Sequence, residues 1–496
     1  MIRIYLSDTA YENDIYPLVK AFYPEEDIKV SEITDKNMDV CAGTGNDSAS
    51  TIRISIECGS AGIFITDGTG KRHESAIDVP NPEKDRQAHK NAIKRGLYGM
   101  LSSLTSKELP WGILTGIRPV KLVYEMLEKG AGEEAIFDKM AEEYLCSREK
   151  TETSIQIARR ELEILTEMDY KNGYSLYIGI PFCPSTCLYC SFTSYSIEKH
   201  GDLVEDYLNA LEKELRYGST CFPDKKLSTV YLGGGTPTTL SARQLDRLLG
   251  LIKDLYDFTH VREFCVEAGR PDSITREKLE VIKSHGVNRI SVNPQSMQQR
   301  TLDLIGRRHT VEQINDAFRM ARDLGFDNIN MDIIIGLLGE TPSDVRDTLE
   351  KIRPLDPESL TVHTLAIKRA ARLNIEKDQY RGLRAQNTAE MLRITREYAC
   401  KNGYLPYYLY RQKNMEDNLE NIGYARHGRE GLYNILIMEE KQTILAMGAG
   451  AMSKFVFHDM NKIERVENVK ALKDYIGRID EMINRKKEFL LNNPGL

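Results

Sequence analysis

"YIGIPFCPSTCLYCSF", residues 177–192, runs from a strand-like segment into three cysteines, Cys183, Cys187 and Cys190. The chain of 496 residues has nine cysteines, and the other six are scattered, which is typical of small buried hydrophobic residues. Three thiolates spaced i, i+4 and i+7 on one loop can converge on a single inorganic group. In a reducing compartment such a group of cysteines favours metal or redox chemistry over disulfides.

The number of cysteines in the loop indicates which inorganic group it holds. Structural zinc usually takes four ligands, often as two separated pairs, and no second cysteine pair lies nearby. The histidines at 200, 260 and 285 show no paired metal-ligand spacing either. An iron–sulfur cube held by three cysteines leaves one iron open to an outside ligand. We therefore favour an iron–sulfur cluster with one open position over zinc and over three cysteines that are buried without binding a metal.

From residue 174 the sequence alternates between strand and helix. The expected strands are SLYIGI (175–180), STVYLG (228–233), EFCVEA (263–268), RISVNP (289–294), INMDIIIG (329–336) and SLTVHTL (359–365). Helical patterns, several of which begin at serine or threonine and end at glycine, lie between them. Such alternation produces right-handed crossovers and a parallel sheet covered by helices. Six strands are too few for the closed eight-stranded barrel, so we predict an α/β fold with an open, partial (β/α)6 barrel.

The regions on either side of the barrel have their own patterns. TIRISIE (51–57) and GIFITDG (62–68) alternate like paired strands, and helical sequence follows them, which predicts an N-terminal α+β domain over residues 1–168. We assign residues 169–400 to the barrel and residues 401–496, which are tyrosine-rich at the start, to a C-terminal α/β extension.

Composition narrows the class of protein. An apolar fraction of 41% and a charged fraction of 28% are those of a soluble globular protein. The formal charge of -7 argues against general nucleic-acid binding, which needs a basic face. The first residues do not form a signal peptide, and no run approaches the roughly 18 apolar residues of a membrane span. We expect a cytoplasmic protein with no membrane span.

Polar and glycine residues gather where the expected strands end. YLGGGTPT (231–238) has three successive glycines, which let the backbone approach a ligand closely. Glu267 lies at the end of a strand, where a carboxylate can accept both hydroxyl protons of a ribose. Gln295, Arg307 and Asp332 also follow strands, begin a helix or interrupt an apolar strand. Because parallel strands end at one edge of a sheet, a ligand site is expected there.

The motif C-x3-C-x2-C after the first barrel strand, with Tyr189 before the last cysteine, resembles the radical S-adenosylmethionine (SAM) superfamily. This resemblance implies a 4Fe–4S cluster held by Cys183, Cys187 and Cys190, with the open iron bound by the amino and carboxylate groups of SAM. Electron transfer from the cluster then cleaves SAM and releases a 5′-deoxyadenosyl radical.

Further segments resemble one branch of that superfamily, the oxygen-independent coproporphyrinogen III oxidase (dehydrogenase) family. They are YIGIPFC, GGGTPT, RISVNPQS, GRRHT and MDIIIGLLGET, over residues 177–341. WGILTGIRPVK and the distal YYLYRQKNM resemble the HemZ-type branch in particular, so the resemblance covers nearly the whole chain.

The resemblance also implies which residues contact the cofactor. Tyr177, Gly234 and Glu267 correspond to positions that hold the first SAM. The positions that correspond to a second SAM site are Tyr189, Gly235, Thr236, Gln295, Arg307, Asp332 and Ala366. The best-known members have a fourth cysteine two residues after the third, where this chain has Phe192. The resemblance therefore leaves open whether one SAM or two are bound.

The implied reaction is oxidative decarboxylation of two propionates of coproporphyrinogen III to vinyl groups, which gives protoporphyrinogen IX. The implied partners are this tetrapyrrole and an electron donor such as flavodoxin or ferredoxin. The alternatives are a haem-binding chaperone that keeps the cluster and SAM, and a radical SAM methylase that modifies haem. Arg308, Arg369 and Arg411 are candidate carboxylate anchors, and in a chaperone His309 and His363 are candidate haem ligands.

Overall fold

The structure is a computed structural model that describes residues 1–34, 50–116, 118–192, 194–366, 371–380, 382–383, 385–412, 419–460 and 462–495. The chain divides into two compact units, residues 1–159 with 410–420, and residues 160–409 with 421–496.

The first unit contains a five-stranded sheet in the order β2-β1-β3-β4-β5. Strand β1 runs parallel to β2 and β3, whereas β3, β4 and β5 are antiparallel neighbours. Burial alternates along β4, where Ala61, Ile63 and Ile65 face the core, and this is the period of a strand with one buried face. The predicted strand pair is thus confirmed. The strands are β1 (Ile2–Leu6), β2 (Ile28–Glu32), β3 (Ser50–Glu57), β4 (Ser60–Thr66) and β5 (Arg72–Asp78).

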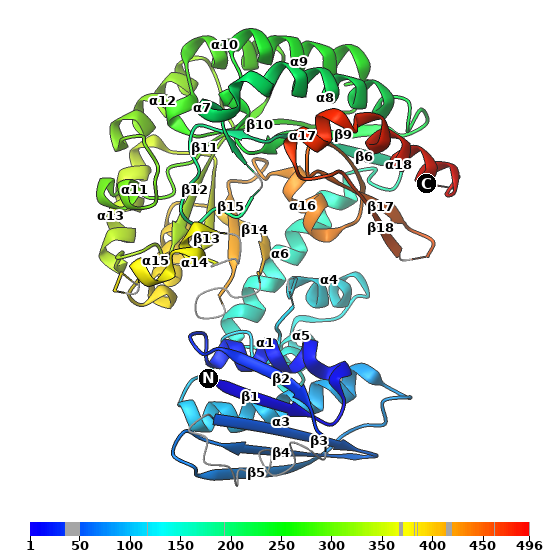
Figure 1. Cartoon of the computed structure of the whole chain (residues 1–496), viewed down its shortest axis with the longest axis vertical. Helices are drawn as coiled ribbons and strands as arrows, with labels where there is room; N and C mark the ends of the chain where they lie inside the picture. Colours follow the sequence, from blue (N-terminus) through cyan, green and yellow to red (C-terminus); the bar gives the residue numbers. More distant parts are fainter. Residues whose placement is uncertain are drawn as a thin grey trace. The chain divides into compact units, whose positions relative to one another are not determined.

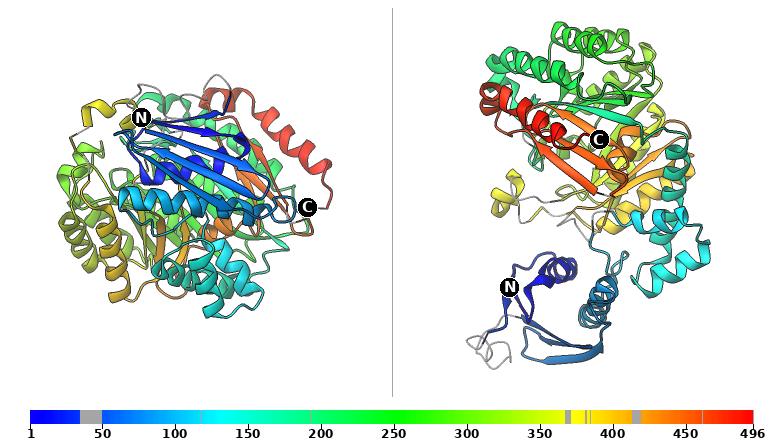
Figure 2. Two further views of the ribbon diagram at one scale, coloured as in Figure 1. Left: turned by 90° about the horizontal axis from the view of Figure 1, so that it is seen from below. Right: turned by 90° about the vertical axis from the view of Figure 1, so that its right-hand side faces the viewer.

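Helices complete the first unit. Two of them, α1 and α3, pack against each other and against the sheet (Figure 2). The side chain of Trp111 is fully buried, and its Nε1 donates to Glu420 Oε2 at 2.8 Å. Lys150 Nζ donates to the other oxygen of Glu420 at 2.5 Å, so two buried side chains hold the carboxylate of Glu420 in this unit. The helices are α1 (Glu12–Phe22), α3 (Arg86–Thr105), α4 (Val120–Glu128), α5 (Glu133–Glu142) and α6 (Arg148–Thr166), whose residues from Arg160 onward belong to the second unit.

The second unit is built on an eleven-stranded sheet in the order β14-β15-β13-β12-β11-β10-β9-β6-β16-β17-β18. Its six central strands are the six predicted ones, and neighbours among them are parallel. Among the described residues the two edge strands do not pair, so the sheet stays open, and the predicted partial barrel is confirmed. These strands are β6 (Gly173–Ile180), β9 (Lys226–Gly234), β10 (Glu263–Gly269), β11 (Arg289–Val292), β12 (Ile329–Ile335) and β13 (Ser359–Thr364).

Helices cover the outer side of this sheet (Figure 1). Their starts follow from local sequence: Ser241 and Gln244 form a capping box at α9, and Thr310 and Gln313 form one at α12. These side chains satisfy backbone N–H groups that a helix start leaves free. The covering helices are α8 (Val204–Gly218), α9 (Ala242–Leu255), α10 (Arg276–Ser284), α12 (Val311–Asp323), α13 (Pro342–Ile352) and α15 (Thr388–Lys401), with the shorter α7 (Ile197–His200), α11 (Gln299–Leu304) and α14 (Arg372–Ile375) between them.

Strands from residues 401–496 extend the barrel sheet at both edges. β15 is antiparallel to β13, and β16 is parallel to β6. Helix α18 packs on α8, where Lys486 Nζ lies 2.7 Å from Glu214 Oε1 with both side chains fully buried. The predicted three-domain division stays a prediction. The elements are β14 (Leu405–Tyr410), β15 (Asn421–Ala425), α16 (Leu432–Glu439), β16 (Thr443–Met447), β17 (Met452–Phe457), β18 (Lys462–Glu467), α17 (Leu472–Gly477) and α18 (Ile479–Leu491).

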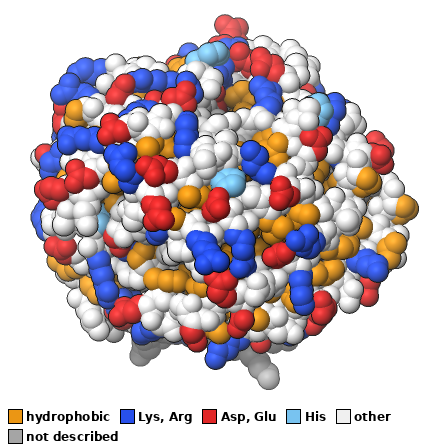
Figure 3. All heavy atoms as spheres, turned by 90° about the horizontal axis from the view of Figure 1, so that it is seen from above, with side chains coloured by type: hydrophobic (Ala, Val, Ile, Leu, Met, Phe, Trp, Pro, Cys, Tyr) orange, Lys and Arg blue, Asp and Glu red, His pale blue; other side chains and the backbone are white. Residues whose placement is uncertain are grey.

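Two further observations concern the surface. In the part of the chain that the structure describes, no helix is long and apolar enough to cross a membrane. On the face drawn in Figure 3, basic and acidic side chains are interspersed.

Candidate functional site at the carboxyl ends of the strands

The cysteine loop follows β6, the first strand of the barrel. It begins with the short strand β7 (Phe182–Cys183), which pairs with β8 (Tyr195–Ser196). Leu188 N donates to Ile305 O at 2.9 Å, and Leu188 O accepts from Leu373 N at 2.9 Å. The loop is therefore held between two distant segments of the same unit, at the end of the sheet where the parallel strands terminate.

The three thiols of the loop are close enough to affect one another's pKa values. Burial is the largest cause that raises the pKa of Cys190 to about 11, and the nearby Cys187 and Cys183 act in the same direction. Burial also raises the pKa of Cys183. Among the described residues, no group of three or more His, Cys, Asp or Glu side chains is placed to hold a single metal ion. In a cubane cluster each thiolate binds its own iron, so the sulfurs need not share one ion. The donor set of three thiols suits such a cluster.

A buried arginine that the sequence reasoning missed lies against this loop. Arg270, which is 4% exposed, donates from Nη1 to Cys187 Sγ at 3.4 Å and to Ser185 O at 3.2 Å. Its Nη2 donates to Ser185 Oγ at 3.0 Å and to Asp272 Oδ2 at 2.6 Å. The only sequence signal for it was its position just after Glu267, at the end of a strand.

The glycines at the end of β9 let this backbone pack closely against the start of the cysteine loop. Gly235 N donates to Ile180 O at 2.7 Å, and a Cβ on Gly235 would lie 2.5 Å from Phe182 O. Gly234 has φ of +99°, in the left-handed region that favours glycine. The next residue, Thr236, is buried with Oγ1 3.5 Å from Cys183 Sγ. Residues 233–235, which we call the glycine cradle, therefore lie directly beside the cysteine loop.

Glu267 faces the inner side of the sheet near the end of β10. Its Oε1 accepts from the Tyr231 hydroxyl, and its Oε2 accepts from Ser291 Oγ and from Asn293 Nδ2. Burial raises the pKa of Glu267, and the nearby Asp332 raises it further. The carboxylate is thus fixed in orientation and retains acceptor capacity, because two carboxylate oxygens offer about four lone-pair sites.

A tyrosine stack supports this carboxylate. The ring centroids of Tyr231 and Tyr433 are 4.3 Å apart, and those of Tyr177 and Tyr231 are 6.2 Å apart. Tyr433 comes from α16, which lies on the inner side of the sheet, opposite the covering helices (Figure 1). The sequence analysis assigned Tyr177 to the cofactor site but gave no role to Tyr231 or Tyr433.

Gln295 has an unusual backbone for a residue with a side chain. Its φ is +66°, and it is 9% exposed. The backbone is held by hydrogen bonds from Gln295 N to Asp332 O at 2.9 Å and from Ile334 N to Gln295 O at 2.8 Å. Its buried Oε1 accepts no hydrogen bond from any described residue. Left-handed backbone strain and an unsatisfied buried acceptor both occur at binding sites.

Arg307 and Asp332 lie beside Gln295. Arg307 is 4% exposed and donates to the Tyr189 hydroxyl at 3.0 Å and to Asn293 O at 2.8 Å, while its Nε has no hydrogen-bond partner among the described residues. Burial works to raise the pKa of Asp332, but His363 and Asn330 hold it below its usual value. Through Arg307, hydrogen bonds thus link the Tyr189 hydroxyl on the cysteine loop to the backbone carbonyl of Asn293, just after β11.

The other residues suggested by the sequence lie in different surroundings. Ala366 is half-buried after β13, and Arg369 lies outside the described residues. Arg308 is exposed, whereas Arg411 is buried in the first unit and donates to Leu114 O. His309 is 0% exposed, so its ring is not accessible to an external haem in this structure. Of the scattered cysteines, Cys146 and Cys265 are buried as predicted, Cys221 is half-buried and Cys58 and Cys400 are exposed, while Cys41 lies outside the described residues.

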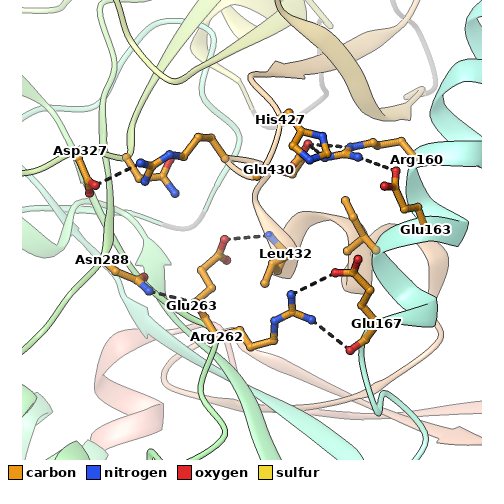
Figure 4. Close-up of a pocket in the computed structure, with 14 residues that line it drawn as sticks. Arg160, Glu163, Glu167, Arg262, Glu263, Asn288, Asp327, His427, Glu430 and Leu432 are labelled. Atoms are coloured by element: carbon orange, nitrogen blue, oxygen red, sulfur yellow. Dashed lines mark hydrogen bonds and ion pairs between the residues drawn. The ribbon is translucent and has the colours of Figure 1, made fainter.

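A cavity of about 450 Å³ lies away from these residues, at the amino-terminal ends of β10, β11 and β12 (Figure 4). Its charged side chains are paired with one another: Arg160 with Glu430, and Arg262 with Glu167. Glu263 accepts hydrogen bonds from the backbone N–H groups of Leu432 and Tyr433 at 2.8 and 3.0 Å. This carboxylate therefore caps α16 and sets the position of Tyr433 in the stack.

Comparison with known proteins shows which family and which solved structure this chain resembles. Residues 177–352 match the profile of the Radical SAM superfamily. The chain is 41% identical to the oxygen-independent coproporphyrinogen-III oxidase-like protein HemZ of Bacillus subtilis, over 85% of this chain and 86% of that protein. It is 34% identical to the haem chaperone HemW of the same organism, over 62% of this chain and 76% of that protein. The structure of coproporphyrinogen III oxidase (HemN) from Escherichia coli aligns with a TM-score of 0.51 and 25% identity, over 63% of this chain and 70% of that one.

Proposed function

The chain belongs to the radical SAM superfamily, in the HemZ-like group of the oxygen-independent coproporphyrinogen III oxidase family, and from this membership we propose that it oxidatively decarboxylates coproporphyrinogen III propionates to vinyl groups. Family membership implies a 4Fe–4S cluster and SAM. The observation that carries the proposal is the 41% identity to HemZ over 85% of the chain, together with a site in which the three thiols, the glycine cradle and Glu267 lie at one end of the barrel.

We assign the cluster to Cys183, Cys187 and Cys190. In the glycine segment beside these thiols Gly234 is exposed, and Glu267 offers a fixed acceptor to ribose hydroxyls. Gln295 and Arg307 each keep a buried polar atom without a described partner, which suits contact with the polar end of SAM. Tyr177, Tyr189, Thr236, Asp332 and Ala366 are the remaining proposed contacts.

The residues of the chain have positioning roles in this scheme. When bound, the cluster and SAM supply a 5′-deoxyadenosyl radical that can take a hydrogen atom from the substrate. The tyrosine stack and the hydrogen bonds to Glu267 keep the carboxylate in one orientation, which lowers the entropic cost of aligning the reactants. An electron donor such as flavodoxin or ferredoxin and a cytoplasmic location stay predictions.

A haem chaperone is the second candidate. The 34% identity to HemW favours it, as does Phe192 at the place of the fourth cysteine, where the side chain is 69% exposed. A methylase that modifies haem is a further alternative, for which the described residues offer no separate support.

The test uses anaerobically reconstituted full-length protein with SAM, a reductant and coproporphyrinogen III. We expect a decarboxylated product, detected by mass, together with 5′-deoxyadenosine. Cys187→Ala should abolish both, whereas Cys400→Ala, which removes an exposed cysteine, should leave both unchanged. Tight haem binding with no decarboxylated product would favour the chaperone.

A further inference from the structure

The guanidinium of Arg270 and the carboxylate of Asp272 form a charged pair under the cysteine loop. We propose that Arg270 is a positioning residue for the cluster, and that the Arg270–Asp272 pair sets the reduction potential of the cluster through Cys187. This inference rests on the assignment of Cys187 as a cluster ligand under the proposed function, and it goes beyond that assignment by naming what tunes the ligand.

All three nitrogens of the Arg270 guanidinium donate hydrogen bonds. Nη1 bridges Cys187 Sγ and Ser185 O, and Nη2 bridges Ser185 Oγ and Asp272 Oδ2. The remaining nitrogen, Nε, donates to Asp272 Oδ1 at 2.9 Å. A planar fork with fixed donors holds such a geometry better than a flexible ammonium can. Arg270 therefore fixes both the path of the loop at Ser185 and the position of the Cys187 sulfur.

The position of this charge determines its effect on a cluster. Hydrogen bonds to cluster sulfurs and the net charge around them set the reduction potential, and charges act more strongly in a buried, low-dielectric site. A positive charge beside a ligand sulfur favours the reduced, more negative cluster. Arg270 therefore raises the potential, and the carboxylate of Asp272 offsets part of that effect.

No other group described around the Arg270–Asp272 pair places a charge directly on Cys187. His309 is fully buried with Nδ1 3.9 Å from Asp272 Oδ1, and burial together with Arg307 lowers its pKa to about 3, so the ring carries no charge at neutral pH. Arg307 donates to the hydroxyl of Tyr189, the residue before Cys190, and not to a cysteine sulfur.

The proposal predicts shifts of opposite sign for the two partners. Arg270→Gln removes the positive charge and should move the midpoint potential to more negative values. Asp272→Asn keeps an acceptor for the guanidinium but removes the negative charge, and should move the midpoint to more positive values. Arg270→Lys keeps the charge and should lie between Arg270→Gln and the unmodified protein. Arg276→Gln, at an exposed arginine on the outer helix α10, should cause no shift.

The measurement is a redox titration of the reconstituted cluster, followed by electron paramagnetic resonance, without SAM or porphyrinogen, alongside iron content per chain. Shifts of the same sign in Arg270→Gln and Asp272→Asn, or no shift in Asp272→Asn at full iron content, overturn the proposal. If Arg270→Gln takes up no iron, Arg270→Lys and Asp272→Asn still decide it. Because no substrate is used, a failure here is distinct from a failure of the proposed reaction, and iron retained in Cys187→Ala would instead contradict the ligand assignment.

Discussion

The hydroxyl of Tyr231 donates a hydrogen bond to the Glu267 carboxylate while the tyrosine ring is stacked on Tyr433, 4.3 Å between centroids. One side chain thus connects α16 on the inner side of the sheet to the acceptor proposed for the ribose of SAM. The hydrogen bond and the stacking can be separated by experiment, because phenylalanine keeps the ring and removes only the hydroxyl.

Tyr231→Phe is expected to weaken SAM binding about 10-fold, since a hydrogen bond to a charged group contributes about 1.5–3 kcal/mol. The hydrogen bond also favours the ionised carboxylate, so its loss should raise the pKa of Glu267 further. The loss of affinity as pH falls should therefore begin at a higher pH in the variant. SAM dissociation constants across pH check this. Tyr256→Phe is the matched control, because that hydroxyl is buried and donates to Leu215 O away from the site.

Gly235→Ala tests the close approach of the glycine cradle to the cysteine loop. The added Cβ would meet two backbone oxygens, at 2.5 and 2.9 Å, and such overpacking costs about 1–3 kcal/mol. Because the backbone that must move leads into Cys183, we expect less than half of the normal iron content after reconstitution. Gly99→Ala, in helix α3 with no atom within 4 Å of the new Cβ, should keep full iron content. Normal iron in Gly235→Ala would mean that the loop can shift without harm.

The sequence predicted the barrel better than its surroundings, for a physical reason. Each of the six strands and most covering helices follow from local periodicity and caps. The strand β16, in contrast, pairs with β6 across about 270 residues, and no local pattern encodes such a pairing. The same holds at the site. Glu267 and Asp332 stood out as polar residues at or within strands, whereas Tyr433 enters only because α16 returns to the inner side of the sheet.

Glu340 is expected to make the stability of the protein depend on pH. Burial raises its pKa from 4.5 to about 7, against the effect of hydrogen bonds from Ser296 and Thr301. The folded state thus holds the proton more tightly than the unfolded state. The bound proton stabilises the folded state fully below pH 4.5, and this contribution is lost as pH rises through about 7. The contribution to the free energy of unfolding is roughly 3 kcal/mol.

Glu340→Gln should remove this slope, because the amide cannot ionise. Urea unfolding at several pH values between 5 and 8 measures it. Glu350→Gln, at an exposed carboxylate paired with Arg353, should leave the slope in place. An unchanged slope in Glu340→Gln would show that another group titrates in this range.

Gln295→Gly separates backbone strain from the side chain's proposed role. At φ of +66°, glycine relieves about 1–2 kcal/mol of left-handed strain, and its greater freedom in the unfolded chain offsets about 0.5–1 kcal/mol of that gain. Stability should therefore change little, while SAM affinity falls about 10-fold, because the unpaired Oε1 acceptor is gone. Ser106→Gly relieves a similar φ of +53° at an exposed residue of the first unit and should leave SAM binding unchanged. If Gln295→Gly binds SAM as tightly as the unmodified protein, the strained backbone serves the packing of β11 against β12, and the amide oxygen takes no part in holding the cofactor.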